Sequence, residues 1–132
     1  MATLLVHIIV KEGREAEFEA IAAELHRATH AHDTGCLRYE YWRGAERGLY
    51  YSLLSFEDHA AFLRHQLSDH HEAAAPRIGE LCETLRLEWV DPLPDASPLP
   101  PTRMQALPDE ADDQTKRYHR LFAATVQAWW PR

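Results

Sequence analysis

The order of hydrophobic patterns along residues 3–90 leaves this chain few possible folds. Residues 3–10 form an almost unbroken apolar, β-branched run, which indicates a central strand buried on both faces. Residues 14–31 then place apolar side chains three and four positions apart, as in an amphipathic helix. Two alternating segments, residues 36–43 and 49–56, flank a short loop with a glycine at each end and predict a β-hairpin.

The pattern continues with two helical segments and a last strand. A short helix should occupy about residues 57–66. Ser68 or Asp69 can cap a second helix, which Pro76 should break or restart. Residues 84–90 alternate between apolar and charged side chains, as a strand does. The resulting order, β-α-β-β-α-β, is typical of ferredoxin-like α+β folds with an antiparallel sheet of strand order 4-1-3-2.

A sheet of this kind has one face without helices. Along residues 36–43 we expect two opposed sets of side chains: Leu37, Tyr39 and Tyr41 on one face, and Arg38, Glu40 and Trp42 on the other. Large aromatic side chains on an open face would contact water, which favours a partner sheet that covers them. We therefore expect a homodimer built as a dimeric α+β barrel.

Residues 1–90 make up this domain, and the segment that follows it divides into two parts. Residues 91–108 contain six prolines and no periodicity, which predicts an extended linker. Residues 109–132 predict an amphipathic helix, because apolar side chains recur at helical spacing from Tyr118 to Trp129. Acidic side chains come first and basic ones later, as the helix dipole favours. We expect this helix to dock on the body of the dimer, on its own or the partner subunit, as a clasp or a lid. Phe122 and Trp129 are the predicted anchors.

Charge and composition exclude several classes of partner. The net charge of −7 gives no basic surface for nucleic acid and disfavours anionic membranes. No apolar stretch is long enough to span a bilayer, and the first residues lack the features of a signal peptide, so we expect a cytoplasmic protein. Cys36 and Cys82 have no metal-site spacing and should lie near opposite sheet edges, as two free thiols.

Three segments carry a resemblance to a known family. Phe56 at the end of a strand is followed by a helix with a His at position 65, a Ser three residues later and a His at position 70. Residues 35–40 read Gly-Cys-Leu-Arg-Tyr-Glu, and residues 10–14 form a Val-Lys-Glu-Gly-Arg turn. Together these segments resemble the antibiotic biosynthesis monooxygenase family over residues 3–90. Two positions depart from the family pattern: Leu54 stands where a Glu is frequent, and Phe56 where a Trp is frequent.

The resemblance implies a cofactor-independent monooxygenase that oxidises a small phenolic, quinol or polyketide-like aromatic molecule with O₂, with no metal. It also implies a lower-ranked alternative, an isomerase of a small signalling molecule, which would need a cationic phosphate site. Arg38, Arg43 and Arg64 are available but form no visible cluster. Haem degradation ranks lower because Phe56 replaces Trp. A non-catalytic small-molecule-binding or stress-associated module is the remaining alternative.

His65 is the candidate catalytic base. It follows Phe62 by three residues, which places it near the apolar face of its helix, and an imidazole exchanges protons near neutral pH. The other interpretation is a core histidine that bonds a backbone carbonyl.

The expected substrate-binding residues follow from the resemblance, which implies a site on the helix side of the sheet near Phe56. They are His7, Tyr50, Ser52, Leu54, Phe56, Phe62 and His70. Some of these have plainer interpretations: His7 can simply bond a neighbouring side chain, and His70 can pack or cap beside the N-cap Ser68. His26 and His30 are four residues apart on a helix, but we expect a solvated face there. The adjacent His70 and His71 should point apart.

Overall fold

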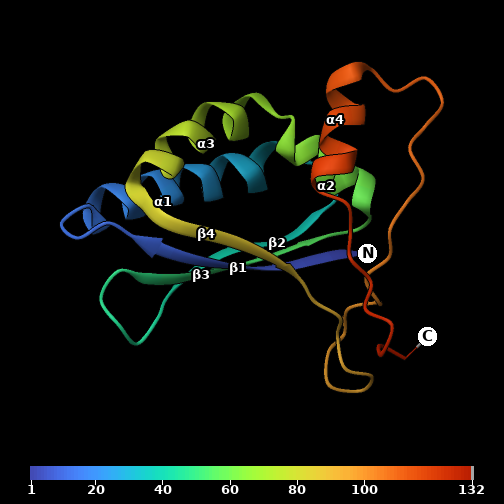
Figure 1. The fold of residues 1–132 in the computed structure, drawn as a ribbon, viewed down its shortest axis with the longest axis horizontal. Helices are drawn as coiled ribbons and strands as arrows, with labels where there is room; N and C mark the ends of the chain where they lie inside the picture. Colours follow the sequence, from blue (N-terminus) through green and yellow to red (C-terminus); the bar gives the residue numbers. More distant parts are fainter. Residues whose placement is uncertain (132) are drawn as a thin grey trace.

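The computed structural model describes residues 1–131, which form a four-stranded antiparallel sheet of order β2-β3-β1-β4, as predicted. The strands and helices follow the predicted order (Figure 1). They are β1 (Ala2–Val10), α1 (Glu15–His32), β2 (Cys36–Arg43), β3 (Leu49–Phe56), α2 (His59–Gln66), α3 (Asp69–Leu81), β4 (Cys82–Trp89) and α4 (Asp113–Leu121).

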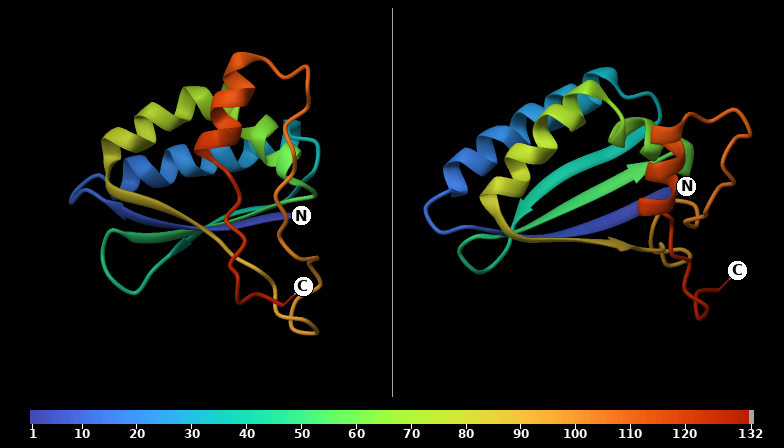
Figure 2. Two further views of the ribbon diagram at one scale, coloured as in Figure 1. Left: turned by 45° about the vertical axis from the view of Figure 1, so that its right-hand side comes forward. Right: turned by 45° about the horizontal axis from the view of Figure 1, so that its top comes forward.

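Helices α1 to α4 lie on one side of the sheet, and no helix of the described residues covers the other face (Figure 2). Alternation along β1 explains this: Leu4, Val6 and Ile8 are buried under the helices, whereas Ile9 on the opposite face is 41% exposed. The central strands β1 and β3 pair so that Leu4 lies opposite Leu54, and both side chains face the core. The predicted set Tyr50, Ser52, Leu54 and Phe56 therefore shares the helix side of β3.

Strand β2 departs from strict alternation at its start. Its register with β3 shifts between Cys36 and Arg38, and the extra residue, Leu37, is 48% exposed. Leu37 was expected on the same face as Tyr39, and this expectation is wrong because the bulge removes Leu37 from the helix side. Tyr39 is buried beneath the helices, and Trp42 on the open face is 60% exposed.

Side-chain caps begin both α2 and α3, and Ser68, the cap of α3, lies in the junction between the two helices. The Asp58 carboxylate accepts a hydrogen bond from the Ala61 backbone at the start of α2, and the Ser68 hydroxyl accepts one from the His71 backbone at the start of α3. Helix α3 continues through Pro76, contrary to the predicted break. The missing hydrogen bond, which typically costs about 3 kcal/mol, is offset by burial of the apolar face of α3.

The region after β4 is extended and then forms one short helix. The Thr102 hydroxyl accepts a hydrogen bond from the Thr3 backbone and donates one to the Val90 carbonyl, which fixes this region to the sheet. Helix α4 covers only Asp113–Leu121, less than the expected 109–132. Its N-cap is Asp112 rather than Asp109, and its C-cap is Phe122, whose backbone leaves the helical conformation.

Helix α4 packs on α2 of its own chain. The ring centroids of Phe122 and Phe62 are 5.8 Å apart, and the Tyr118 hydroxyl donates a 2.6 Å hydrogen bond to Glu72. Trp129, the second predicted anchor, is 79% exposed, because the chain leaves the helix layer after α4 and runs beside β4 (Figure 1). Within residues 1–131, no helix combines the length and hydrophobicity that a membrane span requires.

Candidate functional site

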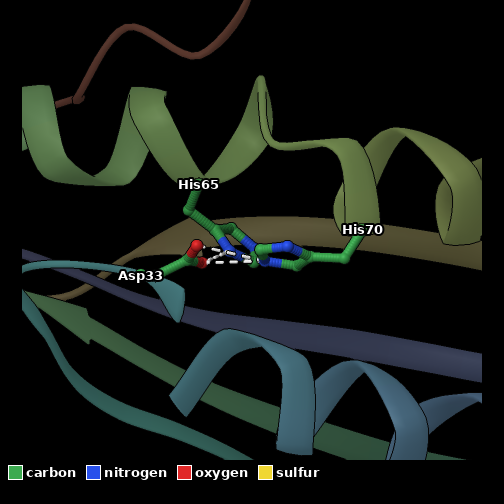
Figure 3. Close-up of side chains that lie close together, drawn as sticks. All are labelled: Asp33, His65 and His70. Atoms are coloured by element: carbon green, nitrogen blue, oxygen red, sulfur yellow. Dashed lines mark hydrogen bonds and ion pairs between the residues drawn. The ribbon is translucent and has the colours of Figure 1, made fainter. Parts of the chain in front are cut away.

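Three ionisable side chains from three elements converge at the junction of α2 and α3 (Figure 3). Asp33 is the C-cap residue of α1, and its backbone N–H donates to the Thr29 carbonyl at 2.9 Å. His65 near the end of α2 approaches the Asp33 carboxylate with Nδ1 at 2.6 Å, and His70 at the start of α3 approaches it with Nε2 at 3.1 Å. We call Asp33, His65 and His70 the Asp–His–His cluster.

His65 is the most enclosed member of the cluster, with 1% of its surface exposed. Its ring packs against three others, with centroid distances of 4.8 Å to Tyr39, 5.3 Å to Phe56 and 4.7 Å to His71. Because Asp33 accepts at Nδ1, the neutral His65 ring carries its proton there. Nε2 is then an unprotonated acceptor, and it has no hydrogen-bond partner among the described residues.

Burial and the shared carboxylate set the charge states. Burial lowers the pKa of His65, although the hydrogen bond to Asp33 opposes this shift. Burial by itself would raise the pKa of Asp33, but the hydrogen bond and charge of His65, and then those of His70, hold it below its usual value. The resting state therefore pairs an ionised Asp33 carboxylate with a neutral His65 imidazole. Burial also lowers the pKa of His71 to about 3.

Several predicted site residues lie around this cluster. Phe56 packs on His65, and Phe62 packs on Phe56 with a centroid distance of 5.8 Å. Leu54 and Ser52 follow on the same face of β3, both buried, and the Ser52 hydroxyl has no hydrogen-bond partner among the described residues. These side chains continue the helix-side surface of the sheet away from His65.

Two predicted site residues lie elsewhere. His7 is on the open face of β1, where its Nε2 is 2.7 Å from the Glu88 carboxylate, so the sheet separates it from His65. The expectation that His7 shares a pocket with His65 is therefore wrong, because adjacent strand positions face opposite ways. Tyr50 is on the correct face but six residues from Phe56 along β3, or about 20 Å. Its hydroxyl donates to Glu19 at 2.8 Å.

Two cavities of the described residues lie along α1, and one of them reaches the cluster at His70. A cavity of about 590 Å³ between α1 and β2 is lined by aromatic side chains that include Tyr41 and Tyr50. A groove of about 210 Å³ between α1 and α3 includes His70 in its wall. His65 lines neither of them.

Sequence reasoning missed two residues of the site. Asp33 was interpreted only as part of a helix stop, and its contact with His65 spans 32 residues, which no local pattern reports. His71 was expected to point away from His70. Both rings instead approach His65, with centroid distances of 4.7 Å for His71 and 6.0 Å for His70. The adjacent residues at the start of α3 therefore flank one histidine.

Comparison with solved structures finds proteins of similar fold. A Caulobacter crescentus protein provisionally named an antibiotic biosynthesis monooxygenase is 26% identical, with a TM-score of 0.66 over 70% of this chain and 89% of that chain. A Bacteroides thetaiotaomicron protein with the same provisional name is 22% identical, with a TM-score of 0.68 over 79% of this chain and 95% of that chain. Rv0793 from Mycobacterium tuberculosis is 20% identical, with a TM-score of 0.66 over 73% and 98%.

The Bacteroides and Mycobacterium proteins are 22% and 20% identical to this chain, so these two similarities show the fold alone. No curated protein matches the sequence. The sequence model of the family described as antibiotic biosynthesis monooxygenase matches residues 1–77, which include the whole Asp–His–His cluster. This match covers more than half of the chain, and the chain therefore belongs to the antibiotic biosynthesis monooxygenase family.

Proposed function

We propose that this protein is a cofactor-independent monooxygenase that oxidises a small phenolic, quinol or polyketide-like aromatic molecule with O₂. The observation that carries the proposal is the state of His65. This imidazole is buried, its Nδ1 is held by the Asp33 carboxylate, and its Nε2 has no partner among the described residues. A buried polar atom without a partner is uncommon in stable folds and is typical of reactive groups.

His65 would act as the general base in this reaction. Its Nε2 removes the phenolic proton, and the Asp33 carboxylate stabilises the imidazolium that forms. The electron-rich phenolate then reacts with O₂. The ring gains one oxygen atom and loses two hydrogen atoms as it becomes a quinone, and the second oxygen atom leaves as water. The substrate supplies all the electrons, so the protein contributes orientation, proton transfer and exclusion of water.

We place the substrate beside Phe56 and Phe62, on the helix side of the sheet. Aromatic walls suit an aromatic ring, and Leu54 keeps this surface apolar. Phe122, which follows α4, packs against Phe62 at this point. Displacement of α4 would expose the surface beside Phe62, so the proposal gives α4 the role of a lid.

The isomerase alternative has less support. A phosphate site needs free cationic side chains in a cluster. Arg43 instead makes two 2.7 Å hydrogen bonds to the Glu19 carboxylate, and Arg64 lies 4.0 Å from Glu57. Both cations are therefore paired with carboxylates.

Oxygen consumption with a panel of quinols and hydroxylated polycyclic aromatics tests the proposed function. On a substrate that reacts, His65→Ala should lower turnover by about a hundredfold or more, because a positioned base contributes about that factor. His26→Ala is the matched control, since its Nδ1 bonds the Tyr39 carbonyl and does not contact the cluster. Equal turnover of the wild type and His65→Ala would refute the role of His65. Ligand binding without oxygen consumption would favour the non-catalytic binding module.

A further inference from the structure

We propose that the Asp–His–His cluster also binds one divalent first-row transition-metal ion, of the class that includes Zn²⁺, Co²⁺ and Fe²⁺. One ligand atom from each of Asp33, His65 and His70 lies within 4.8 Å of the other two. The three side chains point toward one another from the end of α1, from α2 and from α3 (Figure 3). This inference goes beyond the proposed function, which uses His65 without a metal.

The distances are close to those of a coordinated ion. Ligand atoms about 2.1 Å from a metal lie about 3.0 to 3.4 Å from one another when the angles at the metal are between octahedral and tetrahedral. The separation of 3.1 Å between His70 Nε2 and the Asp33 carboxylate already fits. The separation of 2.6 Å between His65 Nδ1 and Asp33 must increase by about 0.5 Å, because a hydrogen bond is shorter than the span across a metal.

The donor set selects the class of ion. Two imidazole nitrogens and one carboxylate form the ligand set of many zinc and non-haem iron sites, whereas Mg²⁺ and Ca²⁺ prefer oxygen ligands. Both histidines can ligate while neutral, since the proton on the ligating nitrogen can move to the other nitrogen of the same ring. Three protein ligands leave further coordination positions for water or a small ligand.

Local structure holds the ligands in place before an ion arrives. Asp33 is fixed by its backbone hydrogen bond to Thr29, and the Ser68 hydroxyl donates to the His65 carbonyl at 2.7 Å. Ser68 also caps α3 through the His71 backbone, so it fixes the two metal-ligating histidines relative to each other. Such preorganisation lowers the entropy lost on binding.

An ion can reach the cluster from the His70 side. The His70 side chain is 19% exposed and forms part of the wall of the groove between α1 and α3, whereas the His65 side chain is fully enclosed. Glu24 and Arg77 lie in the same wall, with Arg77 Nη1 3.9 Å from the Glu24 carboxylate, so their charges offset each other. Because His65 Nε2 has no partner to orient it, we expect an affinity about tenfold to a hundredfold below that of a site with complete outer-shell hydrogen bonds.

Metal binding and base catalysis exclude each other at His65. Coordination through Nδ1 moves the ring proton to Nε2, which can then no longer accept a proton from a phenol. Bound Zn²⁺ should therefore inhibit any oxygen consumption that depends on His65 as a base, and a chelator should restore it.

The test uses the full-length protein after treatment with a chelator and its removal. Co²⁺ titration should give visible d–d absorption with one ion per chain, and Zn²⁺ should displace it. His70→Ala should weaken Co²⁺ binding at least tenfold without unfolding the protein, because this side chain is partly exposed. Asp33→Asn is the second ligand variant. His32→Ala is the matched control, since it removes an exposed imidazole near His70 and leaves the three ligands intact.

The outcomes separate this inference from the proposed function. Absence of saturable Co²⁺ binding, or equal binding by the wild type and His70→Ala, overturns the metal site, whatever the oxygen assay shows. Saturable binding that His70→Ala abolishes supports the site. If oxygen consumption then requires added metal and stops in chelator, the metal site stands and the cofactor-independent function is wrong.

Discussion

Acidification from pH 7 to pH 5 should destabilise the metal-free protein, because the partly buried His71 imidazole resists protonation in the folded state. Burial lowers its pKa from 6.5 to about 3. An unfolded chain therefore binds a proton near pH 6.5 that the folded chain does not accept until about pH 3. The stabilising contribution is complete above pH 6.5 and is lost as the pH falls toward 3.

The magnitude follows from the size of the pKa difference. Each pH unit between the two pKa values changes the free energy of unfolding by about 1.4 kcal/mol. At pH 5 the loss from His71 alone should be about 2 kcal/mol. The pKa values of His59 and His65 are lowered by burial as well, so their contributions have the same sign.

Urea denaturation in the presence of a chelator, at pH 7 and at pH 5, measures this loss. His71→Gln removes the titrating group, so the difference between the two pH values should shrink by about 2 kcal/mol, whatever the variant does to stability at pH 7. His32→Ala, which removes an exposed imidazole, should retain the wild-type difference. Equal pH dependence of the wild type and His71→Gln would refute the assignment of a neutral imidazole at this position.

Other predictions concern assembly, the C-terminal region and the thiols. The open sheet face carries Trp42, which is 60% exposed, so light scattering should give about twice the chain mass of 15.2 kDa, and Trp42→Glu should shift the protein toward that single mass; a wild-type monomer would refute this. Deletion of residues 109–132 should lower the melting temperature, because Phe122 packs on Phe62; an unchanged transition would show that α4 does not stabilise the fold. Mass spectrometry without reductant should find no intrachain disulfide, since Cys36 and Cys82 begin the two edge strands.

The fold could be predicted because each element has its own periodicity. The apolar run of β1, the alternation of β3 and the helical spacing of α1 are repeated signals over eight or more residues. Single-residue events were not predictable in the same way. The bulge that exposes Leu37 requires one extra residue in β2, and α3 tolerates Pro76 because its apolar face is buried against the core. Both are tertiary effects that override local preference.

The candidate site was predictable only in part, and the reason is physical. His65 lies near the apolar face of α2, so its burial follows from helical spacing. Its partner Asp33 lies in a turn whose residue types already predict the end of a helix. The sequence therefore offered no reason to expect a contact between Asp33 and a distant histidine. The helical stripe near the C-terminus was also misleading, because Trp129 matches the spacing but the helix ends at Leu121.

Comparison of the Asp33 and His70 variants distinguishes the two roles proposed for the cluster. An asparagine at this position can still accept a hydrogen bond from His65 Nδ1–H, so it preserves the tautomer with a free Nε2. It carries no charge, so it neither stabilises an imidazolium nor serves as an anionic ligand. Asp33→Asn should therefore lower both turnover and Co²⁺ affinity, whereas His70→Ala should lower Co²⁺ affinity and have a smaller effect on turnover in chelator than Asp33→Asn has.

The distances of the cluster give the reason for this difference. His65 Nδ1 lies 2.6 Å from the Asp33 carboxylate, and His70 Nε2 lies 3.1 Å from it. We assign proton transfer to the shorter contact, whereas coordination of an ion needs both histidines. A hydrogen bond to a charged group contributes about 1.5 to 3 kcal/mol. The free energy of metal coordination must exceed this contribution for His65 to act as a ligand instead of a base. If His70→Ala lowered turnover in chelator as much as Asp33→Asn does, His70 would belong to the catalytic machinery, and the separation of roles would be wrong.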